Sequence, residues 1–309
     1  MLEVSGLSVA FKAGLALRGA ALTLAKGERL GIAGESGSGK TLLGLSLLGM
    51  APEAAHVTGS VQFDGQELVG APETALRSLR GQRIAMVFQE PLSALNPLRR
   101  VGDLIAEPLR LHRGLSRAAA LDRAAALLAE VGLPDPTARL RQYPHEMSGG
   151  QRQRVTIALA LACDPDLLIA DEPTTALDVQ VAAHILDLLR DLSTRRRMAL
   201  ILISHDLRAI ARVTDRLAIL YGGDIVEQGP TADVLAAPRH PYTQGLIAAR
   251  PVLSASRDRR QPLPTIPGNV PALADLPPGC RFSGRCPVEL PHCHSTRPTG
   301  NPACHREAT

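Results

Sequence analysis

The stretch GESGSGKT, residues 34 to 41, decides the fold because it matches the pattern G-x-x-x-x-G-K-[ST] at every fixed position. In such a loop the glycines let backbone N–H groups converge on phosphate oxygens, the lysine places a cation near the terminal phosphates, and the threonine offers a hydroxyl to Mg²⁺. The flanking residues predict a short buried strand before the loop and a helix after it, whose positive end adds to the phosphate site. A tight turn alone would not require the Lys-Thr pair. The candidate nucleotide-contacting residues are Gly34, Glu35, Ser36, Gly37, Ser38, Gly39, Lys40 and Thr41.

A second chemical motif is the apolar segment LLIADE, residues 167 to 172, which ends in two carboxylates. Buried parallel strands deliver the residues at their carboxyl ends to a ligand crevice. Asp171 is therefore a candidate Mg²⁺ ligand, together with Thr41, and Glu172 is a candidate to polarise an attacking water. Acidic residues that merely cap a helix are the alternative interpretation.

Along the sequence before, between and after these motifs, short apolar runs alternate with amphipathic stretches. This alternation predicts an α/β fold with a parallel sheet covered on both faces. The predicted strands are 29–33, 84–88, 167–171 and 199–204, and the predicted helices are 39 to about 50, 118–131, 151–163, 179–194 and 206–213. The Ala- and Leu-rich stretch at 118–131, with its polar side, predicts a small helical subdomain at about 91 to 150.

After residue 250 the composition changes, with eleven prolines between Pro251 and Pro302 and no helical periodicity. We expect a nucleotide-binding domain over residues 1–250 and an irregular, Pro-rich extension over 251–309. Four of the five cysteines lie in the last thirty residues, and such clustering favours a metal site over disulfides in a cytosolic chain. We interpret the fifth, Cys163, as a small core residue inside the helix that precedes Asp171.

Composition excludes several classes of function. The 309 residues carry a formal net charge of +4, have 2% aromatic residues and contain no Trp, which offers little for stacking on nucleic-acid bases. No apolar run reaches the roughly 18 to 20 residues of a membrane helix. The N-terminus lacks a basic stretch followed by an apolar one, so we expect no secretory signal and a cytoplasmic protein.

The stretch Met147-Ser148-Gly149-Gly150-Gln151, just before Arg152, resembles the signature motif of ABC ATPases, with Met147 where Leu is usual. The resemblance covers residues 1 to about 250 and implies a P-loop NTPase of the ABC type, with a RecA-like core, an antiparallel β subdomain and a helical subdomain. It also implies ATP and Mg²⁺ as ligands.

Further residues match the family in the same order along the chain. By this resemblance Gln89 senses Mg²⁺ and meets the membrane subunits, Asp178 belongs to a loop across a dimer interface, and His205 contacts the γ-phosphate. Phe11 falls where the family stacks an aromatic ring on adenine, with a core role as the alternative. In this family two ATPase units pack head to tail, which implies that Ser148, Gly149, Gly150 and Gln151 act on ATP held by the partner unit.

Three features resemble the dipeptide, oligopeptide and nickel importers within this family: the extended loop FQEPLSALNP at 88–97, the motif RHPYTQ at 239–244, and the cysteine-bearing tail. Nickel, glutathione and other solute importers of the same group share these marks. The resemblance implies two integral-membrane permease subunits, a second and paralogous ATPase subunit, and an extracytoplasmic solute-binding protein. It places the chain peripherally at the cytoplasmic face of the bacterial inner membrane.

Soluble ABC ATPases that act on ribosomes or DNA are a remote alternative. They usually carry two cores or a long insertion, whereas this chain has one core and a short insertion between Gln89 and Ser148. A redox sensor built on the cysteine tail has only the tail in its favour.

The tail cysteines Cys280, Cys286, Cys293 and Cys304 have the spacing C-x₅-C-x₆-C-x₁₀-C, which is looser than that of a zinc finger. Spacing alone is compatible with any four-thiolate site, including zinc, and free thiols are the alternative. Cys286 is followed by Pro287, as after cluster cysteines in bacterial ferredoxins. Together with the resemblance, which includes members with a cluster in this tail, this implies a [4Fe–4S] cluster. The tail's three histidines, His292, His294 and His305, are substitute ligands.

Overall fold

Two β-sheets form the centre of the computed structural model, which describes residues 1–89, 95–250 and 264–306. In this described part, an antiparallel sheet has the strand order β2-β1-β4-β5, and a larger sheet has the order β10-β9-β3-β8-β7-β6. The first sheet consists of β1 (Leu2–Phe11), β2 (Gly14–Leu24), β4 (His56–Phe63) and β5 (Gln66–Glu67). The second consists of β3 (Arg29–Ala33), β6 (Ile84–Val87), β7 (Leu167–Asp171), β8 (Ala199–Ser204), β9 (Arg216–Tyr221) and β10 (Asp224–Pro230).

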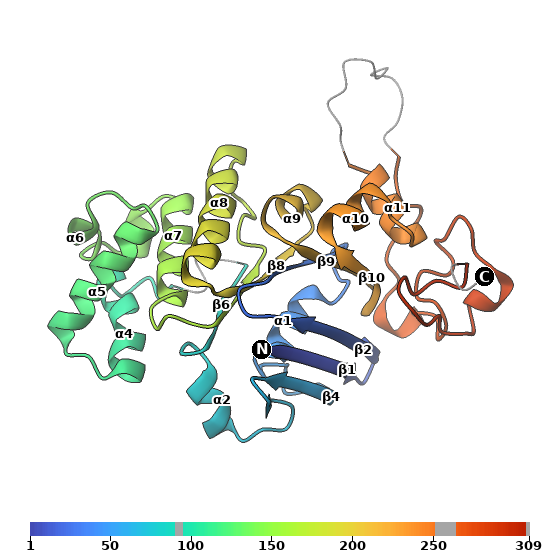
Figure 1. The fold of residues 1–309 in the computed structure, drawn as a ribbon, viewed down its shortest axis with the longest axis horizontal. Helices are drawn as coiled ribbons and strands as arrows, with labels where there is room; N and C mark the ends of the chain where they lie inside the picture. The colour runs from blue at the N-terminus through green and yellow to red at the C-terminus, as the bar shows by residue number, and fades with distance from the viewer. Residues whose placement is uncertain (90–94, 251–263, 307–309) are drawn as a thin grey trace, which may run out of the picture.

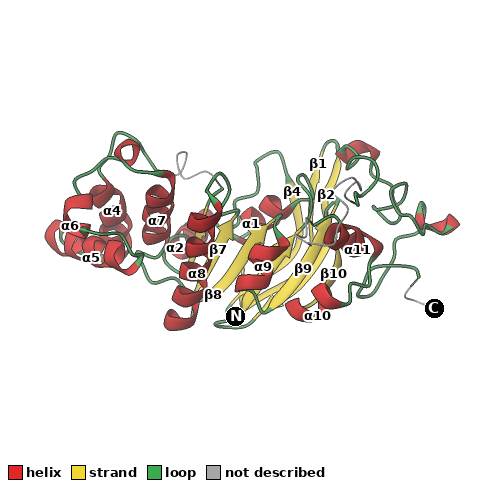
Figure 2. Cartoon of the chain, turned by 90° about the horizontal axis from the view of Figure 1, so that it is seen from above, coloured by secondary structure: helices red, strands yellow, loops and turns green. Residues whose placement is uncertain are grey.

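All pairs in the larger sheet are parallel except β9 with β10, which confirms the predicted parallel sheet. Figure 1 shows α4 to α7 gathered at one end of the molecule, with the sheets in the middle and the C-terminal tail at the other end, and Figure 2 shows the same order from above. The helices are α1 (Lys40–Leu47), α2 (Glu73–Leu79), α4 (Val101–Arg113), α5 (Arg117–Glu130), α6 (Pro136–Arg139), α7 (Gly149–Ala160), α8 (Val179–Arg196), α9 (Leu207–Val213), α10 (Thr231–Ala236) and α11 (Pro241–Ala248).

The larger sheet is buried on both faces, because successive side chains of its strands enter two different cores. In β8, Leu200 and Leu202 pack into the core formed with the helices α4, α5, α7, α8 and α9. Their neighbours Ile201 and Ile203 pack into the core shared with α1 and the antiparallel sheet. This double coverage fixes the strand ends, where the candidate site residues lie.

Strands β3, β7 and β8 have the predicted bounds, while several other predicted elements differ at their ends. Helix α1 ends at Leu47 and strand β6 at Val87. Helix α7 begins earlier than predicted because the Ser148 side chain caps it, and it ends at Ala160. Cys163 therefore lies in the turn before β7 and not inside a helix, although its side chain is fully buried, as predicted.

The described tail residues 264–306 are irregular, as predicted, apart from the short 3₁₀ turns Leu273–Asp275 and Pro291–Cys293. A third such turn, Pro144–Glu146, precedes α7. The tail is anchored by Phe282, whose buried ring packs edge-on against Tyr221 of β9 and Tyr242 of α11.

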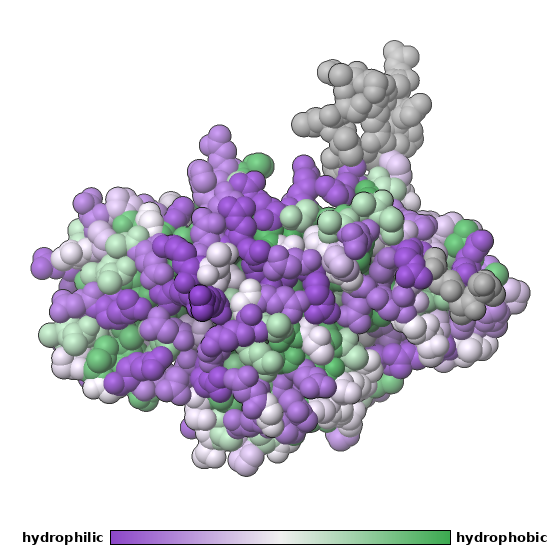
Figure 3. Space-filling view, viewed as in Figure 1, coloured by the Kyte–Doolittle hydropathy of each residue, from purple (hydrophilic) through white to green (hydrophobic). Residues whose placement is uncertain are grey.

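None of the helices in the described ranges has the length and apolar character to span a bilayer. The face seen in Figure 3 is mainly hydrophilic, with hydrophobic residues in small groups.

Candidate functional site

The loop between β3 and α1 adopts a conformation that only its glycines permit. A Cβ added at Gly34 would lie 2.1 Å from the backbone oxygen of Leu220, and Gly37 and Gly39 have φ angles of 78° and 101°. Lys40 begins α1, and its Nζ donates hydrogen bonds to the carbonyl oxygens of Gly34 at 3.0 Å and Glu35 at 2.9 Å. The loop is therefore held in a tight curve around its own lysine.

Burial lowers the pKa of Lys40, while the nearby carboxylates of Glu172, Asp171 and Glu35 act in the opposite direction. A buried ammonium group at the start of a helix is suited to hold an anion, because the helix dipole adds to its positive charge.

Asp171, at the end of β7, is 1% exposed and has a raised pKa, mainly because of burial. The neighbouring Thr41 side chain opposes this shift. Within the described residues, Asp171 Oδ1 and Ser38 Oγ are buried without a hydrogen-bond partner. An unpartnered carboxylate oxygen beside a threonine hydroxyl fits a hard cation such as Mg²⁺.

Glu172 joins the ends of three neighbouring parallel strands. Its carboxylate accepts hydrogen bonds from Gln89 Nε2, beyond β6, at 3.2 Å and from Thr175 Oγ1 at 2.9 Å. Its other oxygen lies 3.2 Å from Nδ1 of His205, beyond β8. Glu172 has a φ of 45°, a conformation that non-glycine residues rarely adopt and that is common at functional sites.

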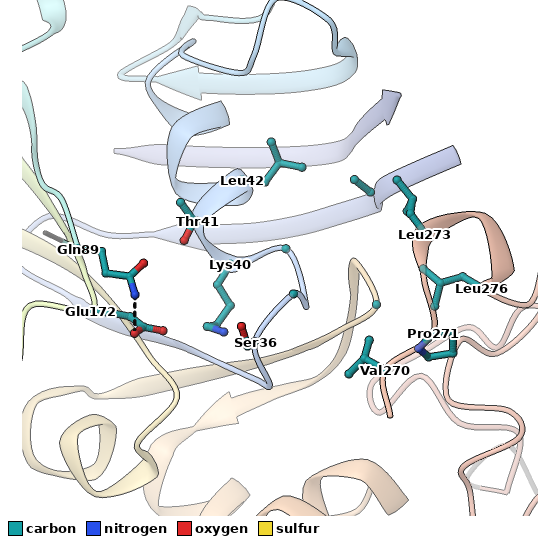
Figure 4. A pocket seen from close by; sticks show the side chains of 14 residues that line it. Ser36, Lys40, Thr41, Leu42, Gln89, Glu172, Val270, Pro271, Leu273 and Leu276 are labelled. Atoms are coloured by element: carbon teal, nitrogen blue, oxygen red, sulfur yellow. Dashed lines mark hydrogen bonds between the residues drawn. The ribbon is translucent and has the colours of Figure 1, made fainter. Parts of the chain in front are cut away.

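A cavity of about 330 Å³ connects the phosphate loop with the carboxylate edge. Ser36, Lys40, Thr41, Gln89 and Glu172 line it, as the close-up in Figure 4 shows. The same cavity is also lined by four residues of the tail, from Val270 to Leu276, which the sequence did not indicate.

Several other predicted site residues do not line this cavity. His205 lines a second cavity with Ala176 and Leu177. Phe11 is half-buried at the end of β1 and packs against the core shared with α1. The predicted permease-contacting loop at 88–97 is described only in part, since residues 90–94 lie outside the described residues.

The residues that resemble the signature motif lie at the start of α7 and do not line the phosphate-loop cavity of their own chain. Ser148 and Gln151 form a reciprocal capping box, with distances of 3.4 Å and 3.0 Å. The glycines allow close packing on the neighbouring loop and helix: an added Cβ at Gly150 would lie 2.6 Å from Val181 of α8. Asp178 caps α8 by accepting from the N–H groups of Gln180 and Val181.

Two contacts that support the phosphate loop come from residues far away in sequence. The backbone N–H of Glu35 donates to the hydroxyl of Tyr242 at 2.8 Å. The Glu35 carboxylate pairs with Arg285, which also donates to the hydroxyl of Tyr221. Sequence reasoning missed these supports, although Tyr242 lies within the motif at 239–244.

The same motif begins with Arg239 and His240, whose backbone N–H groups both donate to the carboxylate of Glu227 in β10. The side chain of His240 caps α11 by accepting from the N–H of Tyr242. These bonds fix the start of α11 and therefore the position of the tyrosine under the phosphate loop.

The four tail cysteines lie near one another. Burial raises the pKa of the Cys280 thiol to about 11, and the thiols of Cys293, Cys286 and Cys304 act in the same direction. Among the described residues, however, no three His, Cys, Asp or Glu side chains converge into a metal-binding group. As a donor set the four thiols suit zinc or an iron–sulfur cluster, but their present geometry is not that of a formed ligand shell.

Three features together define a nucleotide-hydrolysing P-loop ATPase. They are the phosphate loop, a buried carboxylate at a strand end, and a second carboxylate with polar partners. The chain belongs to the ABC transporter family, whose model matches residues 17–175. Residues 226–293 match a second model, described as the C-terminal region of oligopeptide/dipeptide transporters.

Relatives and solved structures agree with this assignment. A peptide import ATP-binding protein of Brucella melitensis is 44% identical over 312 residues, covering 96% of this chain and 92% of that protein. One of Brucella abortus is 48% identical over 303 residues, covering 96% and 90%. A dimeric ATP-binding cassette bound to ADP and phosphate matches with a TM-score of 0.67 at 30% identity, covering 75% of this chain and 99% of that one.

Proposed function

We propose that this chain is the ATP-hydrolysing subunit of a bacterial importer of dipeptides and oligopeptides. The observation that carries the proposal is the match of residues 226–293 to the C-terminal region of oligopeptide/dipeptide transporters, in a chain whose earlier part is an ABC cassette. The names of the relatives support the same substrate class. In this proposal residues 1–250 form the nucleotide-binding domain, with its helical part at about 91–150, and 251–309 form an extension.

The geometry supports some of the proposed roles, and the family resemblance supplies the others. The loop N–H groups and Lys40 bind the phosphates, while Thr41, Asp171 and Gln89 would hold Mg²⁺, which would neutralise phosphate charge. Glu172 orients the attacking water and takes up its proton, and His205 contacts the γ-phosphate. Glu172 is suited to this role because Gln89, Thr175 and His205 fix its carboxylate at the edge of the cavity.

Five residues act across a dimer on the partner's ATP: Ser148, Gly149, Gly150, Gln151 and Asp178. Their position outside the phosphate-loop cavity of their own chain supports this arrangement. Closure of the dimer around ATP, followed by hydrolysis and reopening, then supplies the mechanical output.

The proposed partners are two integral-membrane permease subunits, a second and paralogous ATPase subunit, and an external solute-binding protein. The chain would sit at the cytoplasmic face of the inner membrane through residues near Gln89 to Pro97. Purification of the tagged chain in mild detergent tests this: co-purifying permease subunits are expected, whereas co-purifying ribosomes would favour a soluble ABC ATPase. A peptide bound to the cognate external receptor would establish the substrate class, and nickel or glutathione there would contradict it.

For the tail, the proposal includes one metal centre held by Cys280, Cys286, Cys293 and Cys304, taken to be a [4Fe–4S] cluster. Its support is the grouping of four thiols in a segment with little apolar core of its own. Such a centre would stabilise the tail by linking four separate points. Anaerobic purification should give a brown protein with equal iron and sulfide, whereas a colourless protein with stoichiometric zinc would contradict the iron assignment.

A further inference from the structure

The cavity that contains the phosphate loop has two chemically different ends. Figure 4 shows Gln89 and Glu172 at one side, Lys40 and Ser36 in the middle, and tail side chains at the opposite side. This far wall is apolar and comes from the C-terminal tail, with Ala16 of β2 and Gly222 beside it. The tail residues that line it are Val270, Pro271, Leu273 and Leu276, and we call this set the tail wall.

The tail wall has a consistent orientation. All four of its residues are half-buried, while Ala272, Ala274 and Asp275 between them are exposed. The segment lies against the cassette at two glycines: a Cβ added at Gly14 would be 3.3 Å from the backbone oxygen of Leu273, and one added at Gly222 would be 3.3 Å from the Leu276 side chain. The apolar side of the segment therefore faces the cavity and the cassette.

Hydrogen bonds hold the tail to the cassette on both sides of this segment. Arg285 donates to the carbonyl oxygens of Pro267 at 2.8 Å and Gly268 at 3.2 Å, and it is itself paired with Glu35 of the phosphate loop. Beyond the segment, Arg18 of β2 donates to the carbonyl oxygens of Pro278 and Gly279. The wall is thus fixed relative to the loop that binds the phosphates.

We propose that the tail wall is part of the nucleotide site and packs against the base of the bound nucleotide. A nucleotide has a charged end and a flat, largely apolar end, and the cavity offers phosphate-binding groups at its centre and apolar side chains at its far side. The cavity volume of about 330 Å³ falls within the range of small-molecule sites, which is roughly 300 to 1,000 Å³. Phe11, expected from the family resemblance to contact the base, does not line this cavity.

This inference rests on the proposed role of the phosphate loop. Its test measures the base-binding end of the site separately from the phosphate-binding end. The double variant Leu273→Ala with Leu276→Ala should weaken ATP and ADP binding by about tenfold, because apolar area against the base is lost. Binding of inorganic tripolyphosphate should stay within about twofold of wild type, because the groups that hold phosphates are unchanged. Val288→Ala is the matched control, since Val288 is a partly exposed apolar residue of the tail outside the cavity.

Calorimetric titration of the full chain with ATP, ADP and tripolyphosphate distinguishes the outcomes. Selective loss of ATP and ADP affinity supports the tail wall. Unchanged ATP affinity, or an equal loss for tripolyphosphate, overturns it while leaving the phosphate-loop assignment intact. A wild-type chain that binds neither ATP nor tripolyphosphate overturns both.

Photolabelling of the unmodified chain with 8-azido-ATP or 2-azido-ATP gives an answer that does not depend on the folding of a variant. Trypsin cleavage after Arg260 and Arg281 releases one peptide that contains the complete tail wall. We expect the label in this peptide, and competition by unlabelled ATP. Label confined to peptides before residue 250 would contradict the inference.

Discussion

Replacing Arg285 by methionine should destabilise the phosphate loop, although Arg285 lies 250 residues after its partner Glu35 in the sequence. The Arg285 side chain is 6% exposed and pairs with Glu35, whose side chain is 27% exposed. Methionine fills much of the same space but removes the charge and the donors to Glu35, to the hydroxyl of Tyr221 and to the tail backbone. The carboxylate of Glu35 then stays partly buried without its cation.

The magnitude follows from this geometry. Removing one partner of a fully buried ion pair costs about 3 to 5 kcal/mol. Since Glu35 retains some access to water, we expect the free energy of unfolding to fall by about 2 kcal/mol, below that range. ATP affinity should also fall, because Glu35 belongs to the loop proposed to bind the phosphates and its carbonyl oxygen accepts a hydrogen bond from Lys40.

Chemical denaturation and ATP titration of Arg285→Met, Glu35→Gln and the double variant measure the pair directly. The coupling energy should be at least about 1 kcal/mol, as for residues in direct contact. Arg77→Met is the control, because the Arg77 side chain is 77% exposed and, among the described residues, its ion pair is with Glu73 of the same helix. Additive effects of the two substitutions would refute the idea that Arg285 acts through Glu35.

Three further predictions concern the nucleotide site and its supports. Glu172→Gln should keep ATP binding but slow phosphate release in the reconstituted complex by about a hundredfold or more, because the amide cannot take up the proton from water. Near wild-type turnover would exclude this role for Glu172. Lys40→Ala should weaken ATP binding itself by about tenfold or more, since charge-assisted hydrogen bonds to phosphate are lost, and unchanged affinity would count against the assignment. Burial lowers the pKa of His240 from 6.5 to about 4. Between these two pH values the imidazole binds a proton in the unfolded chain but not in the folded chain. The free energy of unfolding should therefore fall by about 2 kcal/mol from pH 7 to pH 5, and His240→Asn, which preserves the helix cap, should remove this part of the decrease in urea titrations.

Much of the fold was predictable because its signals are local. The phosphate loop and the strands β3, β7 and β8 are each encoded within a few contiguous residues, and the alternation of strands with helices indicates a parallel sheet. Helix ends were less predictable. The start of α7, for example, depends on the side-chain cap from Ser148 and not on apolar periodicity.

The supports of the site could not be predicted in the same way. Tyr242 and Arg285 contact Glu35 across 207 and 250 residues of chain, and nothing near them in sequence indicates their partner. The tail has no apolar periodicity, so its course along β2 and the turn between β9 and β10 depends on individual hydrogen bonds from Arg18 and Arg281. Its apolar residues therefore gave no sequence signal of a place in the nucleotide cavity.

The rate of ATP hydrolysis in proteoliposomes tests the proposed function most directly. The chain would be assembled with its permease subunits and paralogous ATPase, and phosphate release would be compared with and without peptide-loaded external binding protein. We expect the loaded binding protein to stimulate hydrolysis, and Glu172→Gln to abolish most of the stimulated rate. Hydrolysis that does not respond to peptide-loaded receptor, but responds to a receptor loaded with another solute, would contradict peptide import.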